Sequence, residues 1–176
     1  MKSFLFLLPV LLFSITSCKT EAPTGEDPLP DLEFNLSVTG AETHDISFVL
    51  PGNMADTRAG NGSYNSPSGI FVMTFLEANV WQFGMQCMPG GVKVGTFDLS
   101  GGSSFGNISG GTGYTAVSGT LTITEADLYQ NVGSSIGGAD DYFISGRFEA
   151  DMEDTNNPPN QIRVQGTFKG VNIKAN

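Results

Sequence analysis

Apolar and polar residues alternate with a period of two along most of the chain. Residues 32–38 place Leu, Phe, Leu and Val at every second position, and residues 46–50 repeat this pattern after a turn. Residues 70–76 and 80–88 are the most apolar segments, and the short turn between them predicts a hairpin. Alternation of this kind is typical of β-strands with one buried face. Residues 70–76 carry apolar side chains on both faces, which predicts a central strand.

The second half of the chain continues the pattern with two interruptions. Between residues 92 and 99 the apolar phase changes across Gly95, which predicts a β-bulge inside a strand. Residues 117–123 predict another one-sided strand, with Val117 on its apolar face. Residues 124–128, which begin with a threonine suited to capping, predict a single helical turn.

The last two predicted strands form a hairpin that carries a repeated glycine motif. Residues 142–148 and 162–168 are joined by the acidic loop 151–160. Gly146 and Gly166 each lie two residues before a phenylalanine, so the glycine and the ring share one face of the strand. A missing side chain leaves room for a neighbouring ring. We therefore expect these strands to lie side by side.

Three stretches without apolar rhythm are predicted to be loops. Residues 51–68 form the longest, and loops of this length are either functional or mobile. Residues 100–115 carry six glycines. A phosphate-binding loop would be followed by a helix, whereas here a predicted strand follows. Residues 133–141 are predicted to be a glycine-rich turn.

These elements together define the expected fold class. About nine short strands without a convincing helix predict an all-β domain. We expect an antiparallel β-sandwich or barrel of about 8–9 strands, with little or no helix. Residues 32–176 would form this single domain, which is long enough to bury one hydrophobic core.

The N-terminal segment has a continuous apolar run instead of an alternating one. Residues 4–13 follow the basic Lys2 and precede small polar residues. This is the three-part arrangement of an export signal, whereas a helix packed on a core would space its apolar residues by about 3.6. The run is also shorter than the roughly 20 residues that cross a bilayer. Residues 1–17 are therefore predicted to be a signal peptide.

The sequence Ile15-Thr16-Ser17-Cys18 resembles a lipobox, the motif of bacterial lipoproteins. The resemblance implies that Cys18 is acylated, with palmitate among the acyl chains, and that it becomes the N-terminus after cleavage. The partner of this residue would be a lipid bilayer, held stably by more than one acyl chain. Lys19 stands where an aspartate would signal retention in the inner membrane. The resemblance thus implies the bacterial outer membrane, with the domain at its periplasmic face or on the cell surface.

The composition predicts a tether before the domain and argues against nucleic acid as a partner. Residues 18–31 contain the lipidated cysteine, three prolines and four acidic residues, which predicts a semi-extended acidic tether. Without residues 1–17, seven basic residues remain against 18 acidic ones, a net charge of −11. Nucleic acid is not an expected partner, because binding it requires a basic surface.

The cysteine count excludes a disulfide framework. The chain has two cysteines, Cys18 and Cys87. If Cys18 is acylated, Cys87 has no partner within the chain. Cys87 lies in phase with Trp81, Phe83 and Met85, which predicts a buried thiol.

The single histidine predicts neither a catalytic triad nor a metal site. His44 is followed by Asp45, with Ser47 two residues further on. In a strand, His44 and Asp45 point to opposite faces, so we do not expect a catalytic triad and interpret His44 as a surface residue. One histidine and one free cysteine are too few for a zinc or copper site with three or four N/S ligands. No cofactor is expected.

The acidic loop contains candidate metal ligands. Asp151, Glu153 and Asp154 are candidates for calcium, which prefers oxygen ligands. Their spacing does not match an EF-hand loop, and the alternative is a solvated hairpin tip.

Glycoside hydrolysis requires two carboxyls at a set separation in a cleft. The sequence gives no indication of such a cleft, so we do not expect an enzyme.

Four strand motifs carry a resemblance to a family. They are Gly-Thr-Phe-Asp-Leu (95–99), Ser-Gly-Thr-Leu-Thr-Ile-Thr (118–124), Ile-Ser-Gly-Arg-Phe-Glu (144–149) and Gly-Thr-Phe-Lys-Gly-Val (166–171). Together with the lipobox and the acidic tether, they resemble a family of small Bacteroidota lipoproteins of unknown function. The resemblance is clear over about residues 90–173 and implies a lipid anchor and a β-rich fold. These motifs consist of structural glycines and core residues, so the resemblance implies no catalytic residue.

These observations predict a non-catalytic, lipid-anchored binding or adaptor module of the cell envelope, with a glycan as one ligand class. Tyr64, Phe105, Tyr114 and Tyr129 are the candidate contacts, since loop aromatics often bind ligands. The alternative for each ring is that it packs against the core. A second hypothesis is a structural or assembly accessory of an outer-membrane complex, docked at a sheet edge on another envelope protein. A third is a small hydrolase that uses acidic residues.

Overall fold

The computed structural model describes most of the predicted domain. The described residues are 29–53, 57–99, 102–107, 113–130 and 140–176. The predicted signal peptide, Cys18 and most of the tether lie outside the described residues, as does most of the turn predicted at 133–141.

Most of the described residues belong to β-strands. The ranges above contain ten strands and one short 3-10 turn, η1 (Pro51–Asn53), and no helix in them is long and apolar enough to cross a bilayer. The strands are β1 (Leu32–Gly40), β2 (His44–Leu50), β3 (Arg58–Asn65), β4 (Ile70–Glu77), β5 (Trp81–Cys87), β6 (Gly95–Asp98), β7 (Ser104–Asn107), β8 (Gly113–Gln130), β9 (Asp140–Asp154) and β10 (Gln161–Ala175).

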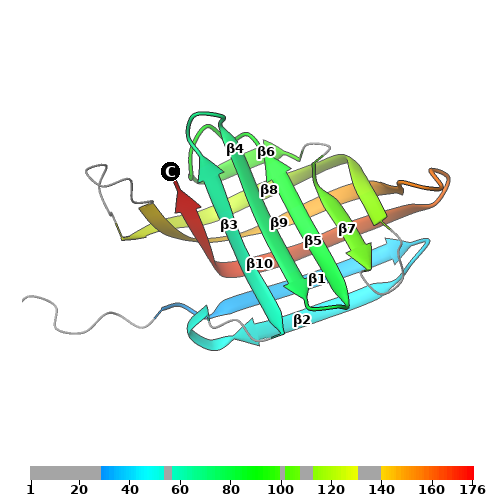
Figure 1. The fold of residues 1–176 in the computed structure, drawn as a ribbon, viewed down its shortest axis with the longest axis horizontal. Coiled ribbons are helices and arrows are strands. Elements are labelled where there is room, and N and C mark those ends of the chain that lie inside the picture. Colours follow the sequence, from blue (N-terminus) through cyan, green and yellow to red (C-terminus); the bar gives the residue numbers. More distant parts are fainter. Residues whose placement is uncertain (1–28, 54–56, 100–101, 108–112, 131–139) are drawn as a thin grey trace, which may run out of the picture.

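Seven strands close into a barrel in the order β3-β4-β5-β7-β8-β9-β10, and β10 returns to β3. β1 and β2 extend the sheet beyond β10, and β6 pairs with the second half of β8. Figure 1 shows two crossing layers, with β3, β4, β5 and β7 in front of the larger sheet β2-β1-β10-β9-β8. The predicted all-β sandwich or barrel is confirmed. Among the pairings described, only β3 with β10 is parallel.

β10 belongs to both layers because it changes partners at a bulge. Up to Lys169 it pairs with β1, and from Asn172 onward it pairs with β3, while β9 accompanies both halves. The register shifts between Phe168 and Val171. In this bulge Gly170 has a φ of 68°, and a Cβ there would collide with the carbonyl oxygen of Asp31. The partner change thus requires glycine at position 170.

The loop predicted over residues 51–68 is wrong, because β3 occupies its second half. The core-facing positions of β3 include Gly60 and Gly62, which give no hydrophobic signal in the sequence. A Cβ at Gly60 would lie 2.7 Å from the Phe75 ring, and one at Gly62 would lie 2.5 Å from Ile173. Side chains of other strands fill the space that residues of β3 would otherwise occupy. The strand is therefore close-packed without large side chains of its own.

A second strand, β7, lies in the glycine-rich stretch 100–115 that was also predicted to be a loop. Its one large inward side chain is Phe105, so no alternation is visible in the sequence. The preceding Ser103 is fully buried, and its hydroxyl oxygen accepts a hydrogen bond of 2.9 Å from the backbone N–H of Gln86.

β8 is one long strand, contrary to the helical turn predicted at 124–128. Three register shifts against β9 fall between Ala116 and Ser118, between Ile123 and Glu125, and between Leu128 and Gln130. Each shift is a bulge that reverses the facing of the residues after it. Val117 is consequently 58% exposed instead of lying on the apolar face. The bulge predicted at Gly95 is also wrong, since Gly95 begins β6.

The glycine motif of the last hairpin behaves as predicted. Gly146 pairs with Phe168, and Gly166 pairs with Phe148, across the β9–β10 ladder. A Cβ at Gly146 would lie 2.8 Å from the Phe168 ring, and one at Gly166 would lie 2.6 Å from the Phe148 ring. Each ring therefore lies over the glycine of the opposite strand and locks the two strands together.

The core lies between the two layers and is rich in aromatic rings. Phe34 of the larger sheet stacks on Phe75 of the smaller sheet, with 4.0 Å between ring centroids, and Phe83 lies 4.7 Å from Phe148. Cys87 is 1% exposed, and burial raises the pKa of its thiol to about 12. The predicted burial of Cys87 is confirmed.

The glycine–phenylalanine packing generates a stability prediction. We expect Gly166→Ala to lower the free energy of unfolding by about 1–3 kcal/mol, because the new methyl group meets the Phe148 ring and the Asn35 carbonyl oxygen. Urea denaturation measures the effect. Gly84→Ala is the control, since a Cβ at that strand position would be no closer than 3.7 Å to any neighbour. Equal denaturation midpoints for the two variants would contradict the packing role of Gly166.

Candidate functional site

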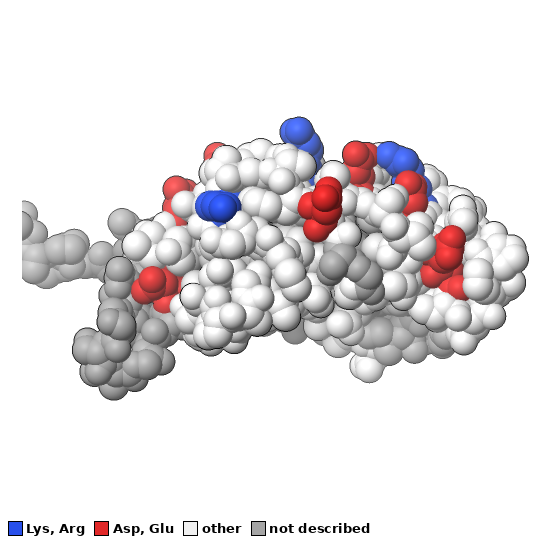
Figure 2. Space-filling view, turned by 90° about the horizontal axis from the view of Figure 1, so that it is seen from above, with Lys and Arg blue, Asp and Glu red and all other residues white. Residues whose placement is uncertain are grey.

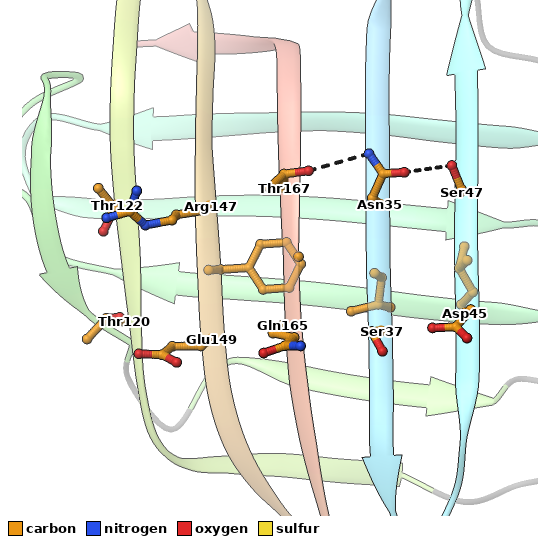
Figure 3. A pocket seen from close by; sticks show the side chains of 14 residues that line it. Asn35, Ser37, Asp45, Ser47, Thr120, Thr122, Arg147, Glu149, Gln165 and Thr167 are labelled. Atoms are coloured by element: carbon orange, nitrogen blue, oxygen red, sulfur yellow. Dashed lines mark hydrogen bonds between the residues drawn. The ribbon is translucent and has the colours of Figure 1, made fainter.

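A groove crosses the outer face of the larger sheet and encloses about 600 Å³. Figure 3 shows its side chains as two rows that run across five strands. The upper row consists of Thr122, Arg147, Thr167, Asn35 and Ser47, and the lower row of Thr120, Glu149, Gln165, Ser37 and Asp45. The remaining lining residues, Leu36, Ile46, Phe148 and Gly166, lie between the rows in sequence and contribute to the floor.

Strand alternation and register together create the rows. In β1, Leu36 is buried in the core, so its neighbours Asn35 and Ser37 point outward. Cross-strand pairing then aligns Asn35 with Thr167, and Thr167 with Arg147. The same register continues into β2 and β8. Polar residues far apart in the chain thereby become immediate neighbours.

Hydrogen bonds orient one half of the upper row. The Ser47 hydroxyl donates to Asn35 Oδ1 at 2.6 Å, and Asn35 Nδ2 lies 3.4 Å from Thr167 Oγ1. At the other end of the row, the hydroxyls of Thr122 and Thr96 lie 3.1 Å apart. The amide and hydroxyl groups are thus ordered on rigid strands before any ligand arrives.

The lower row presents two carboxylates and three neutral polar groups. Glu149 accepts a hydrogen bond of 2.8 Å from Arg163, just outside the groove. Within the described part of the chain, the side chains of Asp45, Ser37 and Gln165 form no hydrogen bond with another residue. These three groups are free to contact a ligand.

Charged residues collect around the groove. Arg163 also bonds to Asp151 at 3.2 Å, and Lys169 bonds to Glu33 at 3.0 Å, which raises the pKa of Lys169. In Figure 2, many of the charged atoms lie along the upper margin, on the side of the larger sheet. The groove therefore lies in a charged, hydrated surface.

The layer formed by β3, β4, β5 and β7, which we call the smaller sheet, has an uncharged outer face. No charged residue occupies an outward position on the described strands β3, β4, β5 and β7. The outward positions are Ala59, Asn61, Ser63, Asn65, Ile70, Val72, Thr74, Leu76, Gln82, Gly84, Gln86, Ser104 and Gly106. We call this surface the uncharged face.

The four aromatic residues predicted to contact a ligand do not form a common surface. Phe105 and Tyr114 are 1% and 2% exposed, so both rings belong to the core. The Tyr114 hydroxyl donates to Glu42 at 3.1 Å, and burial raises its pKa to about 12. Tyr64 packs against the core, and Tyr129, although 40% exposed, lies edge-on to Phe143. In the structure, the rings of Phe105, Tyr114 and Tyr64 pack against the core, which is the alternative to ligand contact.

The three calcium candidates are engaged separately. The Asp151 carboxylate bonds to Arg163, and Glu153 accepts from the amide of Gln161 at 3.1 Å. Asp154 is 7% exposed and accepts backbone N–H groups of Asn156 and Asn157 at 2.8 and 3.2 Å, which closes the β9–β10 turn. The described residues contain no cluster of three or more metal-ligating side chains.

His44 has a local partner and takes no part in a triad. Its Nε2 lies 3.1 Å from Glu42 Oε2, whereas Asp45 and Ser47 point to the opposite face of β2, into the groove. A smaller cavity of about 220 Å³ lies beside His44, where β2 faces Trp81 and Phe105.

Sequence reasoning missed the groove residues. Asn35, Ser37, Gln165 and Thr167 read as the solvated sides of amphipathic strands, which they also are. The signal available in the sequence was the abundance of hydroxyl and amide groups at outward positions. Their assembly into rows depends on strand order and register, which the sequence pattern does not contain.

Comparison with protein-family models, with curated proteins and with solved structures finds no match.

Proposed function

We propose that this protein is a non-catalytic, lipid-anchored binding domain of the bacterial outer envelope, and that it holds a glycan in the groove of the larger sheet. The observation that carries the proposal is the pair of polar rows in Figure 3. The groove is within the range of about 300–1,000 Å³ that is usual for ligand sites.

The chemistry of the rows suits a polyhydroxylated ligand. Sugar hydroxyls both donate and accept hydrogen bonds, and the rows supply amides, hydroxyls and carboxylates that can do the same. Ser47 and Thr167 hold the Asn35 amide in place, so ligand binding does not carry the entropic cost of ordering this side chain. Neighbouring rows are separated by two residues along a strand, about 7 Å, which leaves room for a sugar ring between them.

The positions of the carboxylates support binding rather than hydrolysis. Asp45 is on β2 and Glu149 on β9, three strand spacings apart, which is about 14 Å. Retaining and inverting glycosidases place their carboxyls about 5–9.5 Å apart. Glu149 is also engaged by Arg163. This pair is therefore poorly placed for acid–base catalysis on one glycosidic bond.

The lipid anchor is proposed from the sequence. Acylation of Cys18 would attach the domain to a membrane, and residues 18–31 would provide up to about 45 Å of reach when extended. A binding domain on such a tether can reach ligands at the periplasmic face or on the cell surface.

A second candidate function is supported by the uncharged face. On a chain with a net charge of −10, a four-strand surface without charge avoids the desolvation cost of buried ions. Such a surface fits an equally uncharged surface on an outer-membrane protein, with hydrogen-bonding groups for its amides and hydroxyls, which would make this domain an assembly accessory.

The groove proposal predicts loss of binding upon substitution. We expect at least one of a set of mixed glycan fractions to raise the melting temperature of the wild-type domain. Asn35→Ala combined with Gln165→Ala should reduce the affinity at least tenfold in calorimetry. Both residues are exposed, so the variant should fold normally. Thr74→Ala, on the uncharged face, is the control. Glycan binding that survives the double substitution would place the site elsewhere.

The accessory function predicts a contact from the opposite face. A photo-crosslinking residue in place of Thr74 should capture one integral outer-membrane protein in intact cells, whereas the same residue in place of Thr167 should not. Equal yields from both positions would argue against a dedicated surface.

The anchor is tested by fractionation. We expect Cys18→Ser to leave the protein unacylated and to move it from the membrane to the soluble fraction, because the acyl chains supply the membrane affinity. Metabolic labelling with a palmitate analogue provides the direct readout. Membrane association that persists in Cys18→Ser would overturn the lipobox assignment.

A further inference from the structure

The lining of the groove contains one cation, Arg147, which has no charged partner in the described part of the chain. Among the described residues, none forms an ion pair or a hydrogen bond with its guanidinium group. Its cross-strand neighbours are Thr167 on β10 and Thr122 on β8, which are both uncharged. An unpaired arginine in the middle of a sheet is notable on a chain that has more than twice as many acidic as basic residues.

The two cations nearest to Arg147 on the same sheet face, Arg163 and Lys169, are both neutralised. Arg163 bonds to Glu149 and Asp151, and Lys169 bonds to Glu33. Along β10, Arg163 and Lys169 lie on either side of Thr167, the cross-strand neighbour of Arg147. Acidic residues are thus available nearby, yet they are matched with other cations.

The surroundings of Arg147 form a receptor for a carboxylate. A guanidinium group is a planar fork that binds both oxygens of a carboxylate at once. The flanking Thr122 and Thr167 hydroxyls, and the Asn35 amide beyond them, add hydrogen-bonding groups along the same row (Figure 3). The lower row offers Asp45 and Glu149 as acceptors for hydroxyl groups.

From this arrangement we infer that the ligand is an acidic glycan of the uronate class. The sugar carboxylate binds Arg147, and the ring hydroxyls bind the amides, hydroxyls and carboxylates of the two rows. This inference rests on the proposed glycan-binding function and specifies the ligand for the same groove.

A monovalent carboxylate fits better than a phosphate or a sulfate. Phosphorylated ligands are usually held by clusters of arginines, and the groove lining contains only Arg147 as a cation beside two carboxylates. A dianion would be repelled by Asp45 and Glu149. A single carboxylate bound to the Arg147 guanidinium neutralises its positive charge, and the hydroxyl groups of the ligand then face the lower row.

The test compares a uronate with its uncharged ester. Tetragalacturonate and tetramannuronate, each also as the full methyl ester, are titrated into the wild-type domain and into Arg147→Gln, Arg147→Lys and Lys169→Gln. We expect the wild type to bind at least one free acid at least tenfold more tightly than its ester. Arg147→Gln should abolish that preference, and Arg147→Lys should retain part of it. Lys169→Gln, which removes a paired cation, should stay within about twofold of the wild type. Raising the salt concentration should weaken acid binding and leave ester binding unchanged.

The outcomes separate this inference from the function on which it rests. Equal binding of acid and ester, or a preference that survives Arg147→Gln, overturns the uronate inference. If esters or other neutral glycans still bind and lose affinity in the Asn35→Ala, Gln165→Ala variant, the proposed groove function stands without it. Absence of any glycan binding overturns both.

Discussion

Close packing between glycines of one strand and aromatic rings of another governs the structure. Phe148 lies over Gly166 and Phe168 lies over Gly146, which holds β9 and β10 in one register. β10 in turn joins the two layers, because it leaves β1 and continues along β3 after the bulge at Gly170. A larger residue at these glycines would push the strands apart, since a protein interior has no spare volume.

The groove depends on that register. Side chains on a strand alternate between faces, so a slip of one residue would send the polar row into the core and the core residues outward. With the register held, residues of β1, β2, β8, β9 and β10 form two continuous rows, one of which includes the unpaired Arg147 (Figure 3). The site therefore rests on the regular sheet, where side chains are better ordered than on loops.

Particular residues show where sequence reasoning succeeds and where it fails. The alternation in β1, β4 and β5 is carried by large apolar side chains, and the predicted strands and the buried Cys87 are confirmed. β3 was missed because Gly60 and Gly62 occupy core positions whose space is filled by Phe75 and Ile173 of other strands. β8 was mistaken for a strand followed by a helical turn because three register shifts interrupt the alternation of its side chains.

The sequence by itself determined the all-β class, the amphipathic strands, the glycine–ring motif and the chemical character of the N-terminal segment, because these follow from local periodicity and composition. It also placed polar groups on the outer faces of the strands. Only the tertiary structure decided which strands became neighbours, that Phe105 and Tyr114 turned inward, and that outward polar residues formed rows across the sheet. The physical reason is that strand pairing is non-local. A strand of alternating residues specifies its buried face but leaves its partners to be chosen by packing across the whole core.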